Sequence, residues 1–246
     1  MNITLGDSVS APHPHRPSCE TCSSRNKSIF CDINENVLAD LDRNKVSNDY
    51  KRGAKLFLEG NPPFGLYCIN SGKVKLSKIG NDGKESILRI AGPGSVIGHR
   101  SLFSNEDYMA TATALEDAHI CFIGKKQIFE IVKENPNVAM QIIQTLGREM
   151  GEAEQKSAAL FQKNVKERLA ELLLTLKETY GLAEGTRCKL DIKLTREEMA
   201  SMIGTSSETV IRMMTELKDD GVIEQEGKVI YIVDPEQLIE TANISL

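Results

Sequence analysis

Between Leu194 and Gly227, apolar residues recur at helical spacing in two short runs that small polar residues separate. Thr195 and Glu198 form a capping box, which predicts the start of one helix, and Gly204 predicts its end. Ser206 can cap a second helix. One face of this second helix carries the apolar residues Val210, Met213, Met214 and Leu217. The pattern predicts two short helices joined by a tight turn.

Two short strands are predicted after this helix pair. Gly221 ends the second helix, and the apolar runs Val222-Ile223 and Val229 to Val233 flank a turn at Glu226-Gly227. A helix-turn-helix followed by such a β-wing places its second helix in the major groove of DNA. The C-terminal part of the chain is therefore expected to bind double-stranded DNA.

Residues 48–123 show a different pattern, in which short apolar runs alternate with turn signals. The predicted strands include Lys55 to Phe57, Gly65 to Ile69, Lys73 to Leu76 and Ser86 to Ile90. Residues typical of hairpin turns and sheet corners lie between them, at Asn70-Ser71-Gly72, Asn81-Asp82-Gly83 and Gly92-Pro93-Gly94. Short strands at this regular spacing predict a small antiparallel barrel or jelly roll.

A long helix is predicted after Asn135-Pro136. Its apolar and small residues alternate steps of four and three, which is typical of a coiled-coil seam. The seam consists of Ala139, Ile143, Leu146, Met150, Ala153, Ser157 and Leu160. A helix packed on its own domain is the alternative, but the sustained period favours a homodimer. Glu149, Glu152 and Glu154 flank the seam, and like charges meeting across a dimer would weaken it.

These patterns predict an α+β protein with four parts. Residues 1–18 hold three prolines among small and polar residues, which indicates a disordered tail. Residues 19–134 form a cysteine-containing N-terminal segment and a β-rich effector domain. Residues 135–162 form the dimerisation helix, and residues 163–246 form the winged helix-turn-helix domain, which begins with an amphipathic helix ending at Gly181.

Composition changes this picture only in part. The 246 residues are 40% hydrophobic and 26% charged, as in ordinary globular proteins, and no apolar run is long enough to span a membrane. The N-terminus has no apolar signal region, so we expect a cytoplasmic protein. From Lys163 onward, 11 Lys and Arg residues stand against 16 Asp and Glu residues, a net charge of −5. DNA binding should therefore depend on a few placed residues and on dimerisation rather than on bulk charge.

The six cysteines are the main candidates for further chemistry. Cys19 and Cys22 form a CxxC pair, Cys31 follows closely, and Cys121 stands in a late predicted strand. In a cytosolic chain such residues are metal ligands, reactive thiols or core residues more often than disulfides. Cys68 lies in a predicted strand and is expected to be a core residue, and Cys188 is expected to be structural.

The segment IGTSSETVIRMMTELKDDGVI resembles the DNA-binding segment of the CRP/FNR superfamily of bacterial transcription regulators. YCINSGKVKL and AGPGSVIG resemble the effector β-roll of the same superfamily, which is a cyclic-nucleotide-binding-like domain. The resemblance implies dimeric binding to a palindrome with TGA cores about one DNA turn apart, and RNA polymerase as a partner. It assigns cytosine N4 recognition to Glu208 and guanine recognition to Arg212.

Three further positions complete the expected DNA contacts. Ser207 stands where many relatives carry an arginine, so an outer base of the half-site should be read weakly. Ser206 and Thr209 are expected to cap the helix or touch phosphate.

The resemblance also implies which signal the effector domain detects. Relatives that bind cyclic nucleotides use a glutamate for the ribose and an arginine for the phosphate, and the matching positions here are His99 and about Met109. A phosphate without its cation argues against cyclic-nucleotide binding. Oxygen-sensing members of the FNR branch hold a [4Fe–4S] cluster with an N-terminal cysteine group and one remote cysteine. The ligands implied here are Cys19, Cys22, Cys31 and Cys121, although Cys22 and Cys31 are farther apart than in the best-known members.

The sequence is also compatible with other signals. Four thiolates also suit zinc, and exposed cysteines can act through disulfide formation. Haem, nitric oxide or a small ligand in the β-roll are further alternatives, and His99 is a candidate haem ligand. The chain carries no P-loop, GxSxG or HExxH motif, so no enzymatic activity is expected.

Overall fold

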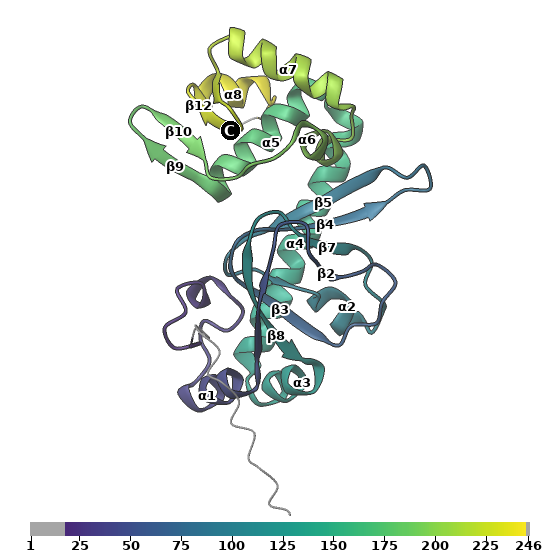
Figure 1. The fold of residues 1–246 in the computed structure, drawn as a ribbon, viewed down its shortest axis with the longest axis vertical. Coiled ribbons are helices and arrows are strands. Elements are labelled where there is room, and N and C mark those ends of the chain that lie inside the picture. Colours follow the sequence, from purple (N-terminus) through teal and green to yellow (C-terminus); the bar gives the residue numbers. More distant parts are fainter. Residues whose placement is uncertain (1–17, 245–246) are drawn as a thin grey trace, which may run out of the picture.

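The structure, a computed structural model, describes residues 18–244. A β-rich effector domain lies at the lower end of Figure 1, a long helix (α4) runs upward from it, and a mostly helical domain lies at the top. The predicted disordered tail falls outside the described residues, except for Ser18.

The effector domain is a roll of two four-stranded antiparallel sheets, as predicted. One sheet has the order β1-β8-β3-β6, formed by Val46–Tyr50, Ala118–Gly124, Gly65–Ser71 and Val96–Ile97. The other has the order β2-β7-β4-β5, formed by Lys55–Phe57, Thr111–Ala114, Val74–Ile79 and Glu85–Ala91. The interior between them is apolar and includes the fully buried Ile69, Ile97 and Ile120.

Short helices surround this roll. They are η1 (Arg25–Lys27), α1 (Glu35–Asn44), α2 (His99–Ser104) and α3 (Lys125–Glu134). Asn34 caps α1 by accepting a hydrogen bond from the Val37 amide, and α1 buries Leu38 and Leu41. These leucines join a hydrophobic cluster with residues of β3, α3 and the start of α4. The N-terminal segment is therefore packed on the outside of the β1-β8-β3-β6 sheet.

The long helix α4 (Pro136–Gln162) begins at the predicted proline. Val138, Ile142 and Ala159 are buried, whereas several apolar side chains on the same helix are exposed. The exposed ones are Met140, Ile143, Met150, Leu160 and Phe161. Of the predicted seam, Ala139 and Leu146 are half-buried and the other five residues are exposed. The seam is thus a face that the chain itself leaves largely uncovered.

The C-terminal domain matches the predicted winged helix-turn-helix. Its elements are α5 (Val165–Tyr180), β9 (Gly181–Glu184), β10 (Arg187–Leu190), α6 (Arg196–Ile203), α7 (Ser207–Asp219), β11 (Ile223–Glu226), β12 (Val229–Ile232) and α8 (Pro235–Thr241). Both halves of the predicted capping box form, between Thr195 and Glu198, and Gly204 ends α6 with φ of 67°. Strand β10 pairs with both β9 and β12.

The core of this domain reaches beyond its own residues. It contains Leu169, Leu173, Val210 and Leu217, but it also includes the buried Ile87 from β5 of the effector domain. No helix within residues 18–244 has the length and apolar character needed to cross a bilayer.

Candidate functional site

The second helix of the helix-turn-helix, α7, presents the predicted DNA-reading side chains. Ser206 caps the helix by accepting a hydrogen bond from the Thr209 amide, and its hydroxyl lies 3.1 Å from the Thr209 hydroxyl. The predicted capping role is therefore confirmed for Ser206, whereas Thr209 supplies the amide that is capped. Glu208 and Arg212 are exposed and stand four residues apart, so both lie on one helical face. Ser207, at the first helical position, is half-buried.

The charge of Glu208 is fixed by its place at the helix N-terminus. Its own backbone amide and the Ser206 hydroxyl lower the pKa of the carboxyl. The side chain is therefore an anion at neutral pH and can accept a hydrogen bond from a base amine.

Ile211 is a surface residue of α7 that the sequence analysis overlooked. Its side chain is 52% exposed, whereas Val210 is fully buried in the domain core. Ile211 lies next to Glu208 and Arg212 on the outward face. The signal was present in the sequence, because an isoleucine falls outside the inward stripe of this helix.

A second feature joins the helix-turn-helix to the effector domain through the β4–β5 hairpin. The Ile87 amide donates a hydrogen bond of 2.8 Å to the Ser201 hydroxyl of α6, which itself donates to the Glu85 carbonyl at 2.7 Å. The Lys156 ammonium of α4 donates to the carbonyl oxygens of Ile87 and Leu88, at 3.1 and 3.0 Å. The hairpin thus contacts the long helix and the first helix of the DNA-binding motif together.

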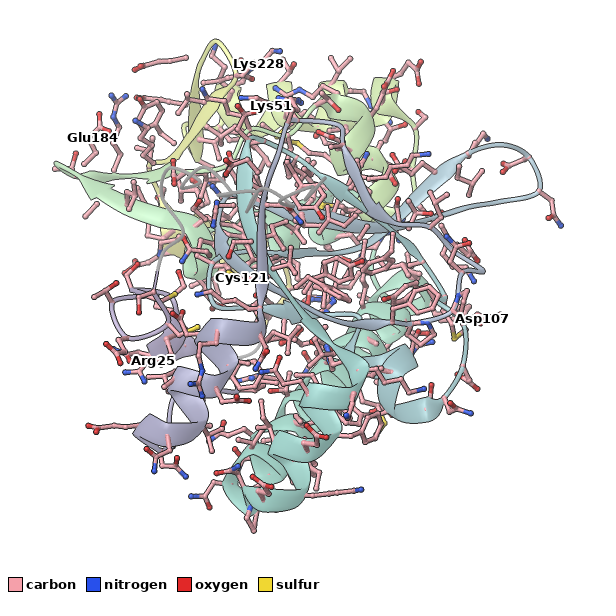
Figure 2. All side chains as sticks on the ribbon, turned by 60° about the horizontal axis from the view of Figure 1, so that its bottom comes forward. Arg25, Lys51, Asp107, Cys121, Glu184 and Lys228 are labelled. Atoms are coloured by element: carbon pink, nitrogen blue, oxygen red, sulfur yellow. The ribbon has the colours of Figure 1, made fainter. Side chains whose placement is uncertain are left out.

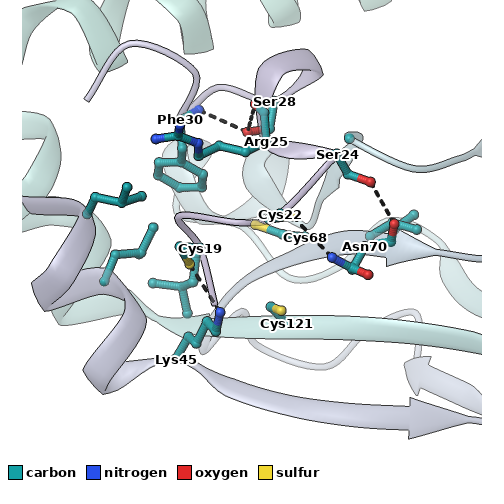
Figure 3. A pocket seen from close by; sticks show the side chains of 15 residues that line it. Cys19, Cys22, Ser24, Arg25, Ser28, Phe30, Lys45, Cys68, Asn70 and Cys121 are labelled. Atoms are coloured by element: carbon teal, nitrogen blue, oxygen red, sulfur yellow. Dashed lines mark hydrogen bonds between the residues drawn. The ribbon is translucent and has the colours of Figure 1, made fainter. Parts of the chain in front are cut away.

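The third feature is a cavity between the N-terminal loop and the β1-β8-β3-β6 sheet, which we call the cysteine cavity (Figure 3). Its volume is about 50 Å³, which is room for roughly three to five water molecules. Its walls include four cysteines: Cys19, Cys22, Cys68 and Cys121. Cys19 and Cys22 come from the loop, Cys68 from β3 and Cys121 from β8.

The strand register explains why two cysteines meet on the sheet. Cys68 lies directly opposite Cys121 in the antiparallel pair β3–β8, and Ser47 of β1 lies opposite Cys121 on its other side. Residues directly opposite each other in an antiparallel pair point to the same face. The Ser47 hydroxyl is 3.4 Å from the Cys121 sulfur. A row of three small polar side chains therefore faces the N-terminal loop.

A lysine lies beside the thiols. Lys45 has a side chain only 2% exposed, and its ammonium donates to the Cys19 sulfur at 3.1 Å and to Asp42 Oδ1 at 2.7 Å. Burial acts to lower the pKa of Lys45, but the hydrogen bonds that its ammonium donates to Asp42 and Cys19 outweigh it, and the net pKa is raised. Burial raises the pKa of the Cys19 thiol to about 11, despite the lysine. The cavity therefore holds a buried cation beside the protonated thiol of Cys19.

Cys31 occupies a different position from the other predicted ligands. It follows Phe30, whose buried ring lines the cavity, but Cys31 itself is not among the lining residues. Burial and the neighbouring Asp32 carboxylate raise the pKa of its thiol. The structure thus places Cys19, Cys22 and Cys121 in the lining of one cavity, together with Cys68, which was expected only as a core residue.

The arrangement of the four thiols can be compared with the needs of a single metal ion and of a four-iron cluster. Among residues 18–244, no three His, Cys, Asp or Glu side chains converge closely enough to hold a single metal ion. A zinc ion needs its ligand atoms within about 2.0–2.3 Å of one centre. A four-iron cubane distributes four thiolates over its corners. The number of thiols that line the cavity equals the number of thiolates that such a cluster binds.

His99 and Glu149 connect α2 with the long helix. His99 is 2% exposed, and its Nε2 lies 3.1 Å from Glu149 Oε2, while Arg89 of β5 donates to Glu149 Oε1 at 2.5 Å. Burial raises the pKa of Glu149, but His99 and Arg89 outweigh it and the net pKa is lowered. The Glu149 charge is therefore paired within the chain. Met109, at the position of the phosphate-binding arginine, contacts the Arg100 guanidinium.

Comparison with known proteins assigns both domains. Residues 47–135 match the cyclic nucleotide-binding domain family, and residues 167–241 match the Crp-like helix-turn-helix domain family. The chain is 31% identical to a CRP-like cAMP-activated global transcriptional regulator of Mycobacterium tuberculosis over 214 residues, covering 87% of this chain and 96% of the relative. It is 27% identical to an anaerobic regulatory protein of Pasteurella multocida, covering 90% of this chain and 81% of the relative.

The fold comparison agrees with the sequence comparison. The structure of FixK2 from Bradyrhizobium japonicum matches with a TM-score of 0.74 at 22% identity, covering 82% of this chain and 99% of that one. Both domains match family models, and a relative of 31% identity covers most of the chain. The protein therefore belongs to the CRP/FNR family of DNA-binding transcription regulators.

Proposed function

We propose that this regulator responds to oxygen or redox state through a cysteine-bound iron–sulfur cluster and binds a TGA-containing palindrome as a dimer. The observation that carries the proposal is the convergence of four cysteines and a buried lysine on one cavity. An anaerobic regulatory protein is among its relatives, which supports the choice of signal. Such a cluster would supply a redox centre that oxygen degrades.

The residues implied as ligands are Cys19, Cys22 and Cys121, with Cys31 as the fourth by resemblance. Cys19 and Cys22 lie on the loop and Cys121 lies on β8, so shared ligation would hold the loop against the sheet. Thiolates around a metal centre bring negative charge into an apolar site, which is costly without a nearby cation. Lys45 supplies that cation.

The cysteine cavity is connected to the long helix through a shared hydrophobic cluster. Phe30, Leu38 and Leu41 line the cavity, and the same hydrophobic cluster includes Val138 and Ile142 of α4. Ordering the loop and α1 would therefore stabilise the packing of α4 on the effector domain. This is the route by which the cysteine site would bias the position of the dimer helices.

The exposed seam of α4 supports a dimer. Ile143, Met150 and Leu160 are 58%, 63% and 46% exposed on one helix. A second copy of the helix would cover them, as in a coiled coil. Two-fold symmetry then presents two α7 helices to half-sites about one turn of DNA apart. RNA polymerase is the expected further partner, and the cytoplasm the expected location.

Recognition of the half-site would use the outward face of α7. Glu208 is suited to accept from a cytosine amine and Arg212 to donate to guanine O6 and N7. Ile211 is suited to an apolar contact with a thymine methyl group. Ser206 and Thr209, engaged in capping, would contact phosphate at most.

Cyclic-nucleotide binding is not proposed, although one relative is cAMP-activated. His99 stands where such relatives place the ribose-binding glutamate, and it is engaged by Glu149 from the long helix. Haem binding through the Nε2 atom of His99 would require breaking the same contact.

The test is anaerobic purification of the full chain, followed by an absorption spectrum with iron and acid-labile sulfide analysis. We expect about four irons per chain and bleaching in air. DNA binding to a TGA palindrome should depend on anaerobic conditions in the wild type and lose that dependence in Cys22→Ser and Cys121→Ser. Cys188→Ser in β10 is the matched control and should behave as the wild type. Unchanged switching in both ligand variants would refute the proposal.

A thiol switch is the second candidate, and the Cys68–Cys121 pair favours it. Cys68 and Cys121 are directly opposite each other across β3 and β8, and dioxygen could oxidise the two thiols to a disulfide by taking up two electrons and two protons. Iron-free protein whose mass falls by two hydrogens per chain in air would support this candidate instead.

A further inference from the structure

The two candidates for a fourth thiolate, Cys31 and Cys68, lie in different surroundings. Cys68 is in β3, directly opposite Cys121, and both side chains face the cysteine cavity. Cys31 follows the buried Phe30 and is outside the cavity lining. Spacing along the chain favours Cys31, whereas the position in space favours Cys68.

The backbone around Cys68 is firmly held. Strand β3 pairs with β8 from Gly65–Gly124 to Ser71–His119, and with β6 on its other side. Strand β8 lies between β1 and β3 in the same sheet. Cys68 and Cys121 are therefore both on central strands, and their relative position is fixed before any ligand binds.

The N-terminal loop is anchored next to Cys68. Asn70, two residues after Cys68, donates from Nδ2 to the Cys22 sulfur at 3.1 Å. The Asn70 carbonyl accepts from the Ser24 hydroxyl at 2.7 Å. These bonds place the CxxC loop over the β3 cysteine, as Figure 3 shows for Cys22, Cys68 and Asn70.

The polar groups of the cavity point to an anionic occupant. The Lys45 ammonium lies 3.1 Å from the Cys19 sulfur. Arg25 also lines the cavity, and its buried Nε finds no acceptor among the described residues. A buried guanidinium N–H without an acceptor is costly, and an anionic group in the cavity would satisfy it.

We propose that Cys68, and not Cys31, is the fourth thiolate of the site, together with Cys19, Cys22 and Cys121. This inference rests on the proposed iron–sulfur function. It makes Cys31 dispensable for holding the cluster, and it places two of the four ligands on adjacent strands of one sheet. It also explains why the loop between Cys22 and Cys31 can be longer than in the best-known relatives, since its length no longer sets the ligand geometry.

The test compares Cys68→Ala with Cys31→Ala in the full chain. Both proteins are reconstituted without oxygen from ferrous iron and sulfide, beside the wild type. Iron, acid-labile sulfide and the visible spectrum are measured, and circular dichroism of the iron-free forms reports folding. We expect about four irons in the wild type and in Cys31→Ala. We expect three or fewer in Cys68→Ala, with the electron paramagnetic resonance signal of a three-iron form or none.

The outcomes separate this inference from the proposed function. A wild type without iron contradicts the proposed function. A wild type with four irons, together with loss of iron in Cys31→Ala or full retention in Cys68→Ala, overturns the choice of Cys68 alone.

If Cys68→Ala does not fold, Cys31→Ala alone still tests whether Cys31 is a ligand. Apart from Cys188 in the DNA-binding domain, that variant retains only Cys19, Cys22, Cys68 and Cys121. Four irons in it support the inference, and loss of iron refutes it.

Discussion

Replacing Glu149 by glutamine tests the link between the long helix and the effector domain. The carboxylate accepts from Arg89 at Oε1 and from His99 at Oε2, at 2.5 and 3.1 Å. An amide has one acceptor oxygen, so one of these donors would face an NH₂ group. The three side chains are only 21%, 31% and 3% exposed for Glu149, Arg89 and His99, so water replaces the lost acceptor poorly.

The expected cost follows from that burial. Leaving a largely buried donor without an acceptor costs about 1–3 kcal/mol, and we take about 2 kcal/mol for Glu149→Gln. For a chain of this length that corresponds to a fall of about 4–8 °C in melting temperature. Urea unfolding and calorimetry at pH 7 would measure both quantities. Glu152→Gln, at an exposed position of the same helix, should change stability by less than about 0.5 kcal/mol.

The pH dependence gives a second check on the same variant. The folded-state pKa of Glu149 is below the ordinary glutamate value of 4.5. A depressed carboxyl pKa contributes stability that is present above the unfolded pKa and is lost as the pH falls through the folded pKa. The stability difference between wild type and Glu149→Gln should therefore be full at pH 7 and shrink below about pH 4.5. A difference under about 0.5 kcal/mol at pH 7, or one that stays constant into acid, would refute the reasoning.

Three further variants test the other parts of the molecule. Arg212→Ala should weaken binding to a TGA palindrome by about 1–3 kcal/mol per half-site in fluorescence anisotropy, and normal binding would remove Arg212 as the guanine reader. Ser206→Ala should lower the free energy of unfolding of the DNA-binding domain by about 1 kcal/mol in thermal melts, because the Thr209 amide loses its cap; an unchanged melt would contradict the capping role. Met150→Glu should shift the protein toward monomer in sedimentation, because it puts charge into the exposed seam, whereas Gln155→Glu should not; equal behaviour of the two would argue against the seam.

Local signals made the DNA-binding domain predictable. The Thr195–Glu198 capping box, the Gly204 end and the Ser206 cap each act within one helical turn, and all three are present. The β-roll strands and the long helix were predictable for a similar reason, since turn residues and Pro136 mark their ends. By contrast, α2 has only six residues, from His99 to Ser104, which is too short for a helical period.

The cysteine site could be predicted only in part, because its decisive contacts are distant in sequence. The alternation in β3 shows that Cys68 faces away from Tyr67 and Ile69, but not what covers that face. The N-terminal loop covers it, through a hydrogen bond between residues 22 and 70. Lys45 carries no sequence signal of burial beside a thiol. Likewise, the pairing of Glu149 with His99 spans 50 residues along the chain, so a heptad pattern does not reveal it.

The shared core at the β4–β5 hairpin makes the two domains difficult to separate. Ile87 is 2% exposed inside the core of the C-terminal domain, and burying such a side chain contributes about 1.5–3 kcal/mol. A fragment cut at Lys163 would lose this side chain and open an apolar hollow over α6. Swapping the helix-turn-helix of another family member onto this effector domain would create a mismatch at the same place. Chimeric regulators built from this chain should therefore carry the hairpin and the helix-turn-helix from the same parent.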